Sequence, residues 1–127
     1  MISPQKTILI VEDEILIFNA LRDKFSSEGF SILEARSGEQ GLEVALAKHP
    51  DLILLDIILP GINGMEMLNK LRKDAWGKDA LVILLTNLNE PAQVSDGLAQ
   101  HVHAYIVKSD WTLEDIVKKV KESLGIR

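Results

Sequence analysis

The chain has 127 residues, a formal net charge of −5 and no cysteine. This length suits one domain with its own core, while the acidic balance argues against a general nucleic-acid binder. Without cysteine, disulfides and thiolate metal sites are excluded. The N-terminus is too short and polar for a signal peptide, and Asp56 and Pro60 interrupt the longest apolar stretch. These features predict a soluble, cytoplasmic domain.

Five short apolar runs have the length and composition of buried parallel strands. The second run is the least apolar, which predicts an edge position in the sheet. Polar residues appear abruptly at the ends of the other runs. The predicted strands are residues 6–11, 30–35, 52–56, 80–86 and 103–108.

A helix is predicted after each strand from the spacing of apolar residues. The first should end at Gly29, and the second should begin with a capping box formed by Ser37 and Gln40. The fourth contains a conflict, because Pro91 suits a first turn whereas Gly97 falls in the interior. The expected apolar faces are Ile17, Phe18, Leu21 and Phe25; Leu42, Ala45 and Leu46; Met65, Met67, Leu68 and Leu71; and, in a last helix capped by Thr112 and Asp115, Leu113, Ile116, Val117, Val120 and Leu124.

Five strands alternating with five helices predict a doubly wound α/β fold, with a parallel sheet between two layers of helices and right-handed crossovers. No repeat, linker or low-complexity segment divides the chain. Sheets of this kind bind ligands at the carboxyl ends of their strands. The residues at those ends are Glu12 and Asp13, Asp56, Thr86 and Lys108.

Three acids, a hydroxyl and an amine are therefore expected at one edge of the sheet. Clustered carboxylates repel one another unless a cation neutralises them, and Mg²⁺ is commonly held by carboxylates, waters and phosphate oxygens. Beside such an ion, Asp56 could attack phosphorus and form an acyl phosphate. Lys108 and Thr86 could then donate to the transferring phosphoryl oxygens.

Each of these residues also has an ordinary explanation. Asp13 could cap the first helix, Asp56 could stabilise the turn that follows it, and Lys108 could simply be exposed. Tyr105 could be a core aromatic or a switch residue, and both tryptophans suit packing roles. The coincidence of five polar residues at one sheet edge is what favours a site.

Several short motifs follow one another along the chain: Val11-Glu12-Asp13-Glu14, Leu54-Leu55-Asp56, Pro60-Gly61 with Asn63-Gly64, Leu85-Thr86, and Ala104-Tyr105-Ile106-Val107-Lys108. With these motifs the chain resembles the receiver domain of two-component response regulators, of the CheY-like kind. The resemblance covers residues 1–127 as a single receiver domain. It implies a three-layer (βα)5 flavodoxin-like fold whose five-stranded parallel sheet has the order 2-1-3-4-5.

The resemblance also implies a phosphorylation-controlled signalling switch in a phosphorelay. Asp56 would accept a phosphoryl group from a sensor histidine kinase or a histidine phosphotransfer protein. Mg²⁺, or Mn²⁺ in its place, would be held by Asp13, Asp56 and the backbone carbonyl of Ile58, with Glu12 acting through water.

By the same resemblance, Thr86 and Lys108 would contact the phosphoryl group and Tyr105 would turn inward. The face made by helix four, strand five and helix five would then change its binding to a downstream protein or a detached output domain. The domain is expected to be a monomer or a phosphorylation-dependent dimer, with no direct contact to nucleic acid or membrane. It would catalyse only its own phosphorylation and dephosphorylation, rather than turning over a small substrate. The sequence at hand encodes no output region after the expected fifth helix, so a stand-alone receiver, a phosphate-shuttling intermediate and a domain of a larger regulator remain open.

The chain departs from the family pattern at four positions. Ser109 stands where the family usually has a proline in a cis bond, and a non-proline cis bond costs roughly 3–4 kcal/mol, so a trans peptide is expected. Asn87 stands where a small residue usually follows the threonine. Ile58 and Leu88 are apolar at the positions that admit or exclude the attacking water. The hypothesis is that this pair shields the acyl phosphate and slows self-dephosphorylation.

Two other functions compete with this interpretation. An aspartyl-phosphate phosphotransferase or hydrolase would use the same acids, lysine and Mg²⁺. Such enzymes generally need an acid/base carboxylate two residues after the nucleophile, and Ile58 occupies that position. A receiver-like module that no longer takes phosphate is kept open by Ser109 and Asn87, although the intact acids disfavour it.

Overall fold

The computed structural model describes residues 5–86 and 102–126, and of Thr86 and Asp110 only the backbone. The expected helix containing Pro91 and Gly97 falls outside the described residues. No helix in the described ranges is long and apolar enough to cross a membrane. The elements are β1 (Thr7–Val11), α1 (Ile15–Ser27), β2 (Ser31–Ala35), α2 (Gly38–Lys48), β3 (Leu52–Asp56), α3 (Gly64–Arg72), the 3₁₀ turn η1 (Gly77–Asp79), β4 (Val82–Thr86), β5 (Ala104–Val107), the 3₁₀ turn η2 (Lys108–Asp110) and α5 (Leu113–Ser123).

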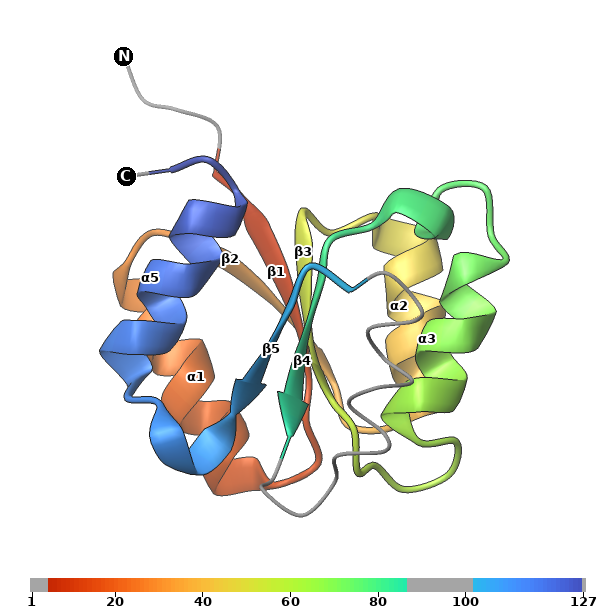
Figure 1. Cartoon of the computed structure of the whole chain (residues 1–127), viewed down its shortest axis with the longest axis horizontal. Coiled ribbons are helices and arrows are strands. Elements are labelled where there is room, and N and C mark those ends of the chain that lie inside the picture. The colour runs from red at the N-terminus through yellow and green to blue at the C-terminus, as the bar shows by residue number, and fades with distance from the viewer. Residues whose placement is uncertain (1–4, 87–101, 127) are drawn as a thin grey trace.

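The five strands form one parallel sheet in the order β2-β1-β3-β4-β5, as the resemblance implied. The least apolar strand, β2, lies at the edge, which confirms the expectation from its composition. All strands point the same way, so their carboxyl ends meet along the lower edge of the sheet in Figure 1. That edge is where an open parallel sheet presents its ligand site.

Helices cover both faces of the sheet, with α1 and α5 on one side and α2 and α3 on the other (Figure 1). Successive strand residues point to opposite faces, which divides the core in two. In β1, Ile8 and Ile10 pack toward α1 and α5, whereas Leu9 and Val11 pack toward α2 and α3. Every residue of β3 is buried, so this strand runs through the centre of the molecule as its continuous apolar run predicted.

Helix ends follow local sequence signals closely. Thr112 and Asp115 form the predicted capping box at the start of α5. The Ser37 hydroxyl accepts from the Gln40 backbone N–H, as predicted for α2, but the Gln40 side chain accepts from the Arg36 N–H instead of completing a box. The prediction of a full capping box was therefore wrong, because the Gln40 side chain bonds the N–H of the residue before Ser37.

The buried face of α2 differs from the predicted one. Leu46 is 37% exposed, so its assignment to the core was wrong, although Ala45 is fully buried. The cause is the close approach of the helix to its neighbours at Gly41, where an added Cβ would lie 2.9 Å from the Met67 Sδ and 3.0 Å from Val11. A helix that packs through its small residues turns its larger ones outward.

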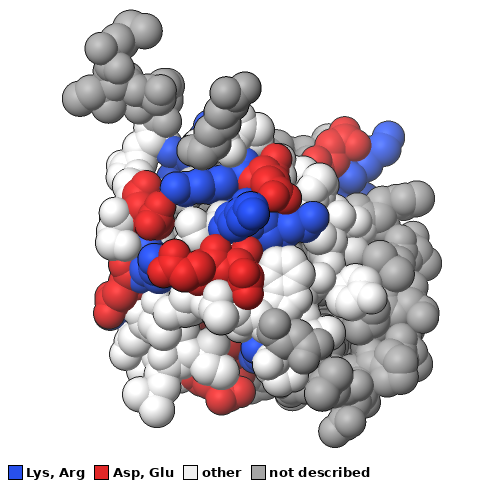
Figure 2. Space-filling model, turned by 60° about the vertical axis from the view of Figure 1, so that its left-hand side comes forward, with Lys and Arg blue, Asp and Glu red and all other residues white. Residues whose placement is uncertain are grey.

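Ion pairs join α1 to α5 on the outer face of the layer that these two helices form. Lys24 pairs with Glu114 at 2.6 Å, and Lys121 pairs with Glu28 at 2.6 Å. Lys24 also lies 3.8 Å from Glu28, so the four side chains form one network, called the helix cluster below. Figure 2 shows acidic and basic side chains lying next to one another on this face of the molecule.

Candidate functional site

Four charged side chains gather at the carboxyl edge of the sheet. Glu12 and Asp13 follow β1 directly, Asp56 is the last residue of β3, and Lys108 comes immediately after β5. β1 and β3 are hydrogen-bonded neighbours, so their acids arrive side by side. β5 lies two strands away from β3, a span that the long lysine side chain bridges.

The Lys108 ammonium joins the two buried acids. Its Nζ donates to Glu12 Oε1 at 2.9 Å and to Asp56 Oδ2 at 3.0 Å. The second oxygen of each carboxylate accepts from backbone: Asp56 Oδ1 from the Ile58 N–H at 3.3 Å, and Glu12 Oε2 from the Glu14 N–H at 3.3 Å. Glu12 is fully buried, and the Asp56 side chain is 3% exposed. Buried carboxylates of this kind persist only when they are hydrogen-bonded and paired.

The electrostatics of this site are set by burial and by an excess of acid. The pKa of Glu12 is raised from its ordinary value of 4.5 to about 7, chiefly by burial; the neighbouring Asp56 contributes to the rise, and the Lys108 ammonium opposes it with a smaller effect. Burial alone would lower the pKa of Lys108, but its bonds to the two carboxylates outweigh this and raise that pKa. The single ammonium of Lys108 therefore leaves the site with excess negative charge, which a further cation could neutralise.

The donor set fits a hard divalent cation. One carboxylate oxygen from each of Glu12, Asp13 and Asp56 lies within 4.8 Å of the others. Oxygen donors in this number suit Mg²⁺, which keeps several waters besides one or two carboxylates. Asp13 is exposed while the other two acids are buried, so the cluster opens to solvent on the Asp13 side.

Comparison with known proteins identifies the family. The sequence profile of the response regulator receiver domain matches residues 8–121. The chain belongs to this family. It is thus a receiver domain of the response regulators of two-component signalling, and its family is one of signalling proteins rather than metabolic enzymes.

Named relatives agree with this assignment. The transcriptional regulatory protein AfsQ1 of Streptomyces coelicolor is 38% identical over 103 residues, which are 80% of this chain and 44% of that protein. The CheY-like receiver domain protein of Methanospirillum hungatei is 29% identical, with a TM-score of 0.88 over 96% of this chain and 95% of that one. The receiver domain of the sensor histidine kinase PA1611 of Pseudomonas aeruginosa, solved with a magnesium ion coordinated in its active-site cleft, shares the fold at 21% identity and a TM-score of 0.87, over 96% and 99% of the two chains. The chain spans about half the length of the curated relatives it matches.

The receiver structure distinguishes between the alternatives open for individual residues. Asp13 does not cap α1, since Glu14 is the N-cap residue and makes no side-chain cap bond. Asp56 does hold the turn after it, through the Ile58 N–H, while also bonding Lys108, so the two interpretations are compatible. Tyr105 is 43% exposed, which excludes a core role. The two tryptophans are partly buried against the two halves of the core, as predicted.

Other predicted site residues are described in part or not at all. Thr86 ends β4 and pairs with Val107, but its side chain is not among those described. Asn87 and Leu88 lie outside the described residues. The peptide bond between Lys108 and Ser109 is trans, as expected, because the described residues contain no cis bond.

Two features of the site were missed from sequence. The complete burial of Glu12 was not expected, because an acid directly after a strand is commonly solvated. The backbone N–H of Ile58 donates to Asp56, the candidate nucleophile, whereas the sequence had predicted roles only for the Ile58 side chain and carbonyl. The Asp-turn pattern after β3 was a signal that could have found the second feature.

Proposed function

We propose that this receiver domain is a phosphorylation-controlled switch in which Asp56 takes a phosphoryl group from a phosphohistidine. The donor is a sensor histidine kinase or a histidine phosphotransfer protein. The observation that carries the proposal is the Asp56 carboxylate itself: it is buried at the carboxyl edge of a receiver fold, and its two oxygens accept from Lys108 and from the Ile58 N–H. A nucleophile held in this way is oriented before its substrate arrives.

In the proposed reaction an Asp56 oxygen attacks phosphorus as the bond from phosphorus to the histidine nitrogen breaks. The bonding electron pair leaves with the imidazole, which takes a proton from solvent, and an acyl phosphate remains on Asp56. The Lys108 ammonium is 3.0 Å from Oδ2 and so is placed to donate to a phosphoryl oxygen. Thr86, at the end of the neighbouring strand, is proposed as a second donor.

The proposal includes Mg²⁺, or Mn²⁺ in its place, held by Asp13, Asp56 and the Ile58 carbonyl, with Glu12 acting through water. Such an ion neutralises the carboxylates and the charge on the transferring oxygens when bound. The three carboxylates within 4.8 Å support this part of the proposal. The magnesium ion in the PA1611 receiver domain is consistent with it.

Phosphorylation is proposed to act on the face that includes β5 and α5. In this proposal Thr86 moves toward the phosphoryl group, and Tyr105, which is now 43% exposed, turns inward. A downstream protein or a detached output domain reads this change, and the receiver is a monomer or dimerises on phosphorylation. Because the domain is acidic, it is proposed to make no direct contact with nucleic acid.

The phosphodonor is proposed to be a cytoplasmic protein, and an apolar groove beside the site supports a protein as the donor. The groove holds about 300 Å³ between α1 and α5, and the Lys108 side chain forms part of its wall. At its rim, Leu16 is 81% exposed. An exposed leucine at the edge of a groove next to the nucleophile suits contact with a partner protein.

The phosphorylated lifetime is proposed to be lengthened by Ile58, Asn87 and Leu88. Ile58 is 48% exposed at the edge of the site, where an apolar side chain can hinder an attacking water. Its apolar character also argues against the hydrolase alternative, which needs a carboxyl group there. A lifetime shorter than that of an Ile58→Asn, Leu88→Glu double variant would contradict this hypothesis.

The central test is Mg²⁺-dependent labelling with a small phosphodonor, with the site mapped by mass spectrometry. Wild type should be labelled, Asp56→Ala should not, and Asp23→Ala, which removes an exposed aspartate of α1, should match wild type. Labelling of Asp56→Ala at the wild-type level would overturn the proposal. Failure of the wild type to label, with bound Mg²⁺ shown by calorimetry, would favour the inactive receiver-like module.

A further inference from the structure

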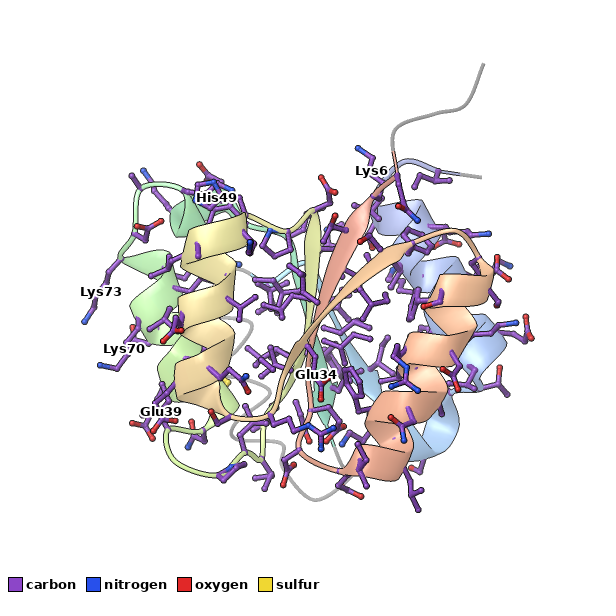
Figure 3. The ribbon with its side chains drawn as sticks, turned by 180° about the vertical axis from the view of Figure 1, so that it is seen from behind. Lys6, Glu34, Glu39, His49, Lys70 and Lys73 are labelled. Carbon is purple, nitrogen blue, oxygen red and sulfur yellow. The ribbon has the colours of Figure 1, made fainter. Side chains whose placement is uncertain are left out.

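The loop that leaves Asp56 rests on the N-terminus of α2. The Ile62 backbone N–H donates to Glu39 Oε1 at 3.1 Å. Next to it, Gly61 has a φ of +71°, and an added Cβ would lie 2.3 Å from the same carboxylate oxygen. Figure 3 shows Glu39 at the N-terminal end of α2, beside this loop. The contact therefore needs both an acceptor oxygen at the end of the side chain of residue 39 and a glycine at position 61.

The start and end of the loop are fixed by the backbone. The Ile57 N–H donates to the Leu85 carbonyl, and the Gly64 N–H donates to the Ile57 carbonyl at 2.8 Å. Gly64 also packs directly on the strand, since an added Cβ would lie 2.3 Å from the Asp56 carbonyl oxygen. Within the described chain, the bond from Ile62 to Glu39 is the hydrogen bond that ties the middle of the loop, residues 59–62, to another element.

The loop in turn orients the nucleophile. Its second residue, Ile58, donates its N–H to Asp56 Oδ1 at 3.3 Å, while Lys108 takes Oδ2. The Ile58 N–H is therefore one of two groups that define the rotation of the Asp56 carboxylate. Because this bond is already long for an N–H···O contact, a small shift of the loop would break it.

We propose that Glu39 is a positioning residue for Asp56, acting through residues 58–62. Its carboxylate holds Ile62, this fixes the loop, and the fixed loop keeps the Ile58 N–H on Asp56 Oδ1. The inference rests on the proposed function, since it concerns the phosphoacceptor role of Asp56. The simpler alternative is that Glu39 only stabilises the first turn of α2 through the helix dipole.

Three variants separate these roles. Glu39→Ala removes the acceptor, and Glu39→Gln keeps an acceptor oxygen but removes the charge. Glu43→Ala is the matched control, because Glu43 is exposed on the same helix and makes no hydrogen bond or ion pair with the described residues. Each is measured for amide hydrogen exchange at Ile58 and Ile62 without metal, for thermal midpoint, and for the rate of labelling by a small phosphodonor.

Glu39→Ala should speed exchange at both amides and slow labelling by about tenfold, less than the roughly 100-fold that a 1 Å misplacement can cause. Glu39→Gln should stay within about twofold of wild type in both readouts, because its amide oxygen can still accept from the Ile62 N–H, although more weakly than a carboxylate does. Glu43→Ala should match wild type.

Equal labelling by Glu39→Ala and wild type would overturn the proposal while leaving the function of Asp56 intact, as would equal losses in Glu39→Ala and Glu39→Gln. A wild type that takes no label at Asp56 would instead remove the function on which the inference rests.

Discussion

Two charged networks join distant parts of this chain, and they differ in almost every physical respect. At the carboxyl edge, Lys108 bonds Glu12 and Asp56, which lie 96 and 52 residues away. On the outer face, the helix cluster joins residues of α1 and α5 that are 90 or more apart. The first network is buried and holds more acid than base. The second is partly exposed to solvent and contains two lysines and two glutamates.

The difference shows why geometry alone does not identify a functional site. The shortest ion pairs of the two networks are in the helix cluster, at 2.6 Å, yet exposed pairs contribute little because water and salt screen them. The pairs at the carboxyl edge are longer, at 2.9 and 3.0 Å, but their carboxylates have lost their hydration. An uncompensated charge that is kept out of water is costly to folding, and it is available for binding a cation or a phosphoryl group.

Removing one lysine from each network should give the largest contrast. Lys108→Met should lower the free energy of unfolding by about 3–5 kcal/mol at pH 8 without metal, because it leaves buried carboxylates without their cation. Labelling at Asp56 should fall by about 100-fold or more with the loss of a phosphoryl contact. Lys121→Met is the matched control from the helix cluster and should leave labelling unchanged. Urea unfolding and phosphodonor labelling measure both effects, and equal destabilisation by the two variants would break the comparison.

The titration of Glu12 should give the next largest effect. Its pKa rises from 4.5 to about 7 on folding, so between these values the folded protein binds more protons than the unfolded chain. Raising the pH through this window therefore lowers the free energy of unfolding by about 3 kcal/mol, because a tenfold change in proton concentration is worth about 1.4 kcal/mol. The contribution is complete below pH 4.5 and lost above about pH 7.

Urea unfolding in chelator at pH 5 and pH 8 measures this loss. Glu12→Gln, which cannot ionise, should flatten the dependence, whichever way it changes the absolute stability. Glu114→Gln is the control, since it removes an exposed acid of the helix cluster and should keep the wild-type slope. If Glu12→Gln keeps the slope as well, another group is responsible for it.

Most of the fold was predictable because the signals that define it are local. Continuous apolar runs marked the buried strands, and Thr112 with Asp115 marked the start of α5. The error at Leu46 came from packing between elements, because the sequence of α2 does not reveal that Gly41 lets the helix approach Val11 and Met67. Periodicity describes which residues share a face, but not which of two adjacent faces is turned inward.

The residues of the site were predictable in position and less so in environment. Parallel strands bring their carboxyl ends to one edge, so the acids at the ends of β1 and β3 were expected near the lysine that follows β5. The burial of Glu12 and the contact of Glu39 with the loop after Asp56 depend on the tertiary arrangement, and no local pattern encodes them. The helix cluster was missed for the same reason, since its partners are far apart in sequence.

The helix cluster should show a small effect of opposite sign to that of Glu12. The hydrogen bond from Lys121 lowers the pKa of Glu28, so the ionised form favours the folded state. This stability is present above pH 4.5 and is lost as the pH falls through the lowered value, whereas the Glu12 contribution is lost as the pH rises. Thermal midpoints of wild type and Glu28→Gln should therefore differ slightly at pH 7 and converge as the pH falls through the lowered pKa of Glu28. At pH 7 molar salt should also close the gap, because its Debye length of about 3 Å screens exposed pairs, while leaving the Glu12 slope in place. A difference in thermal midpoint that survives molar salt would mean that the helix cluster is shielded from solvent like the carboxyl edge. The two networks would then differ in their balance of charge rather than in their burial.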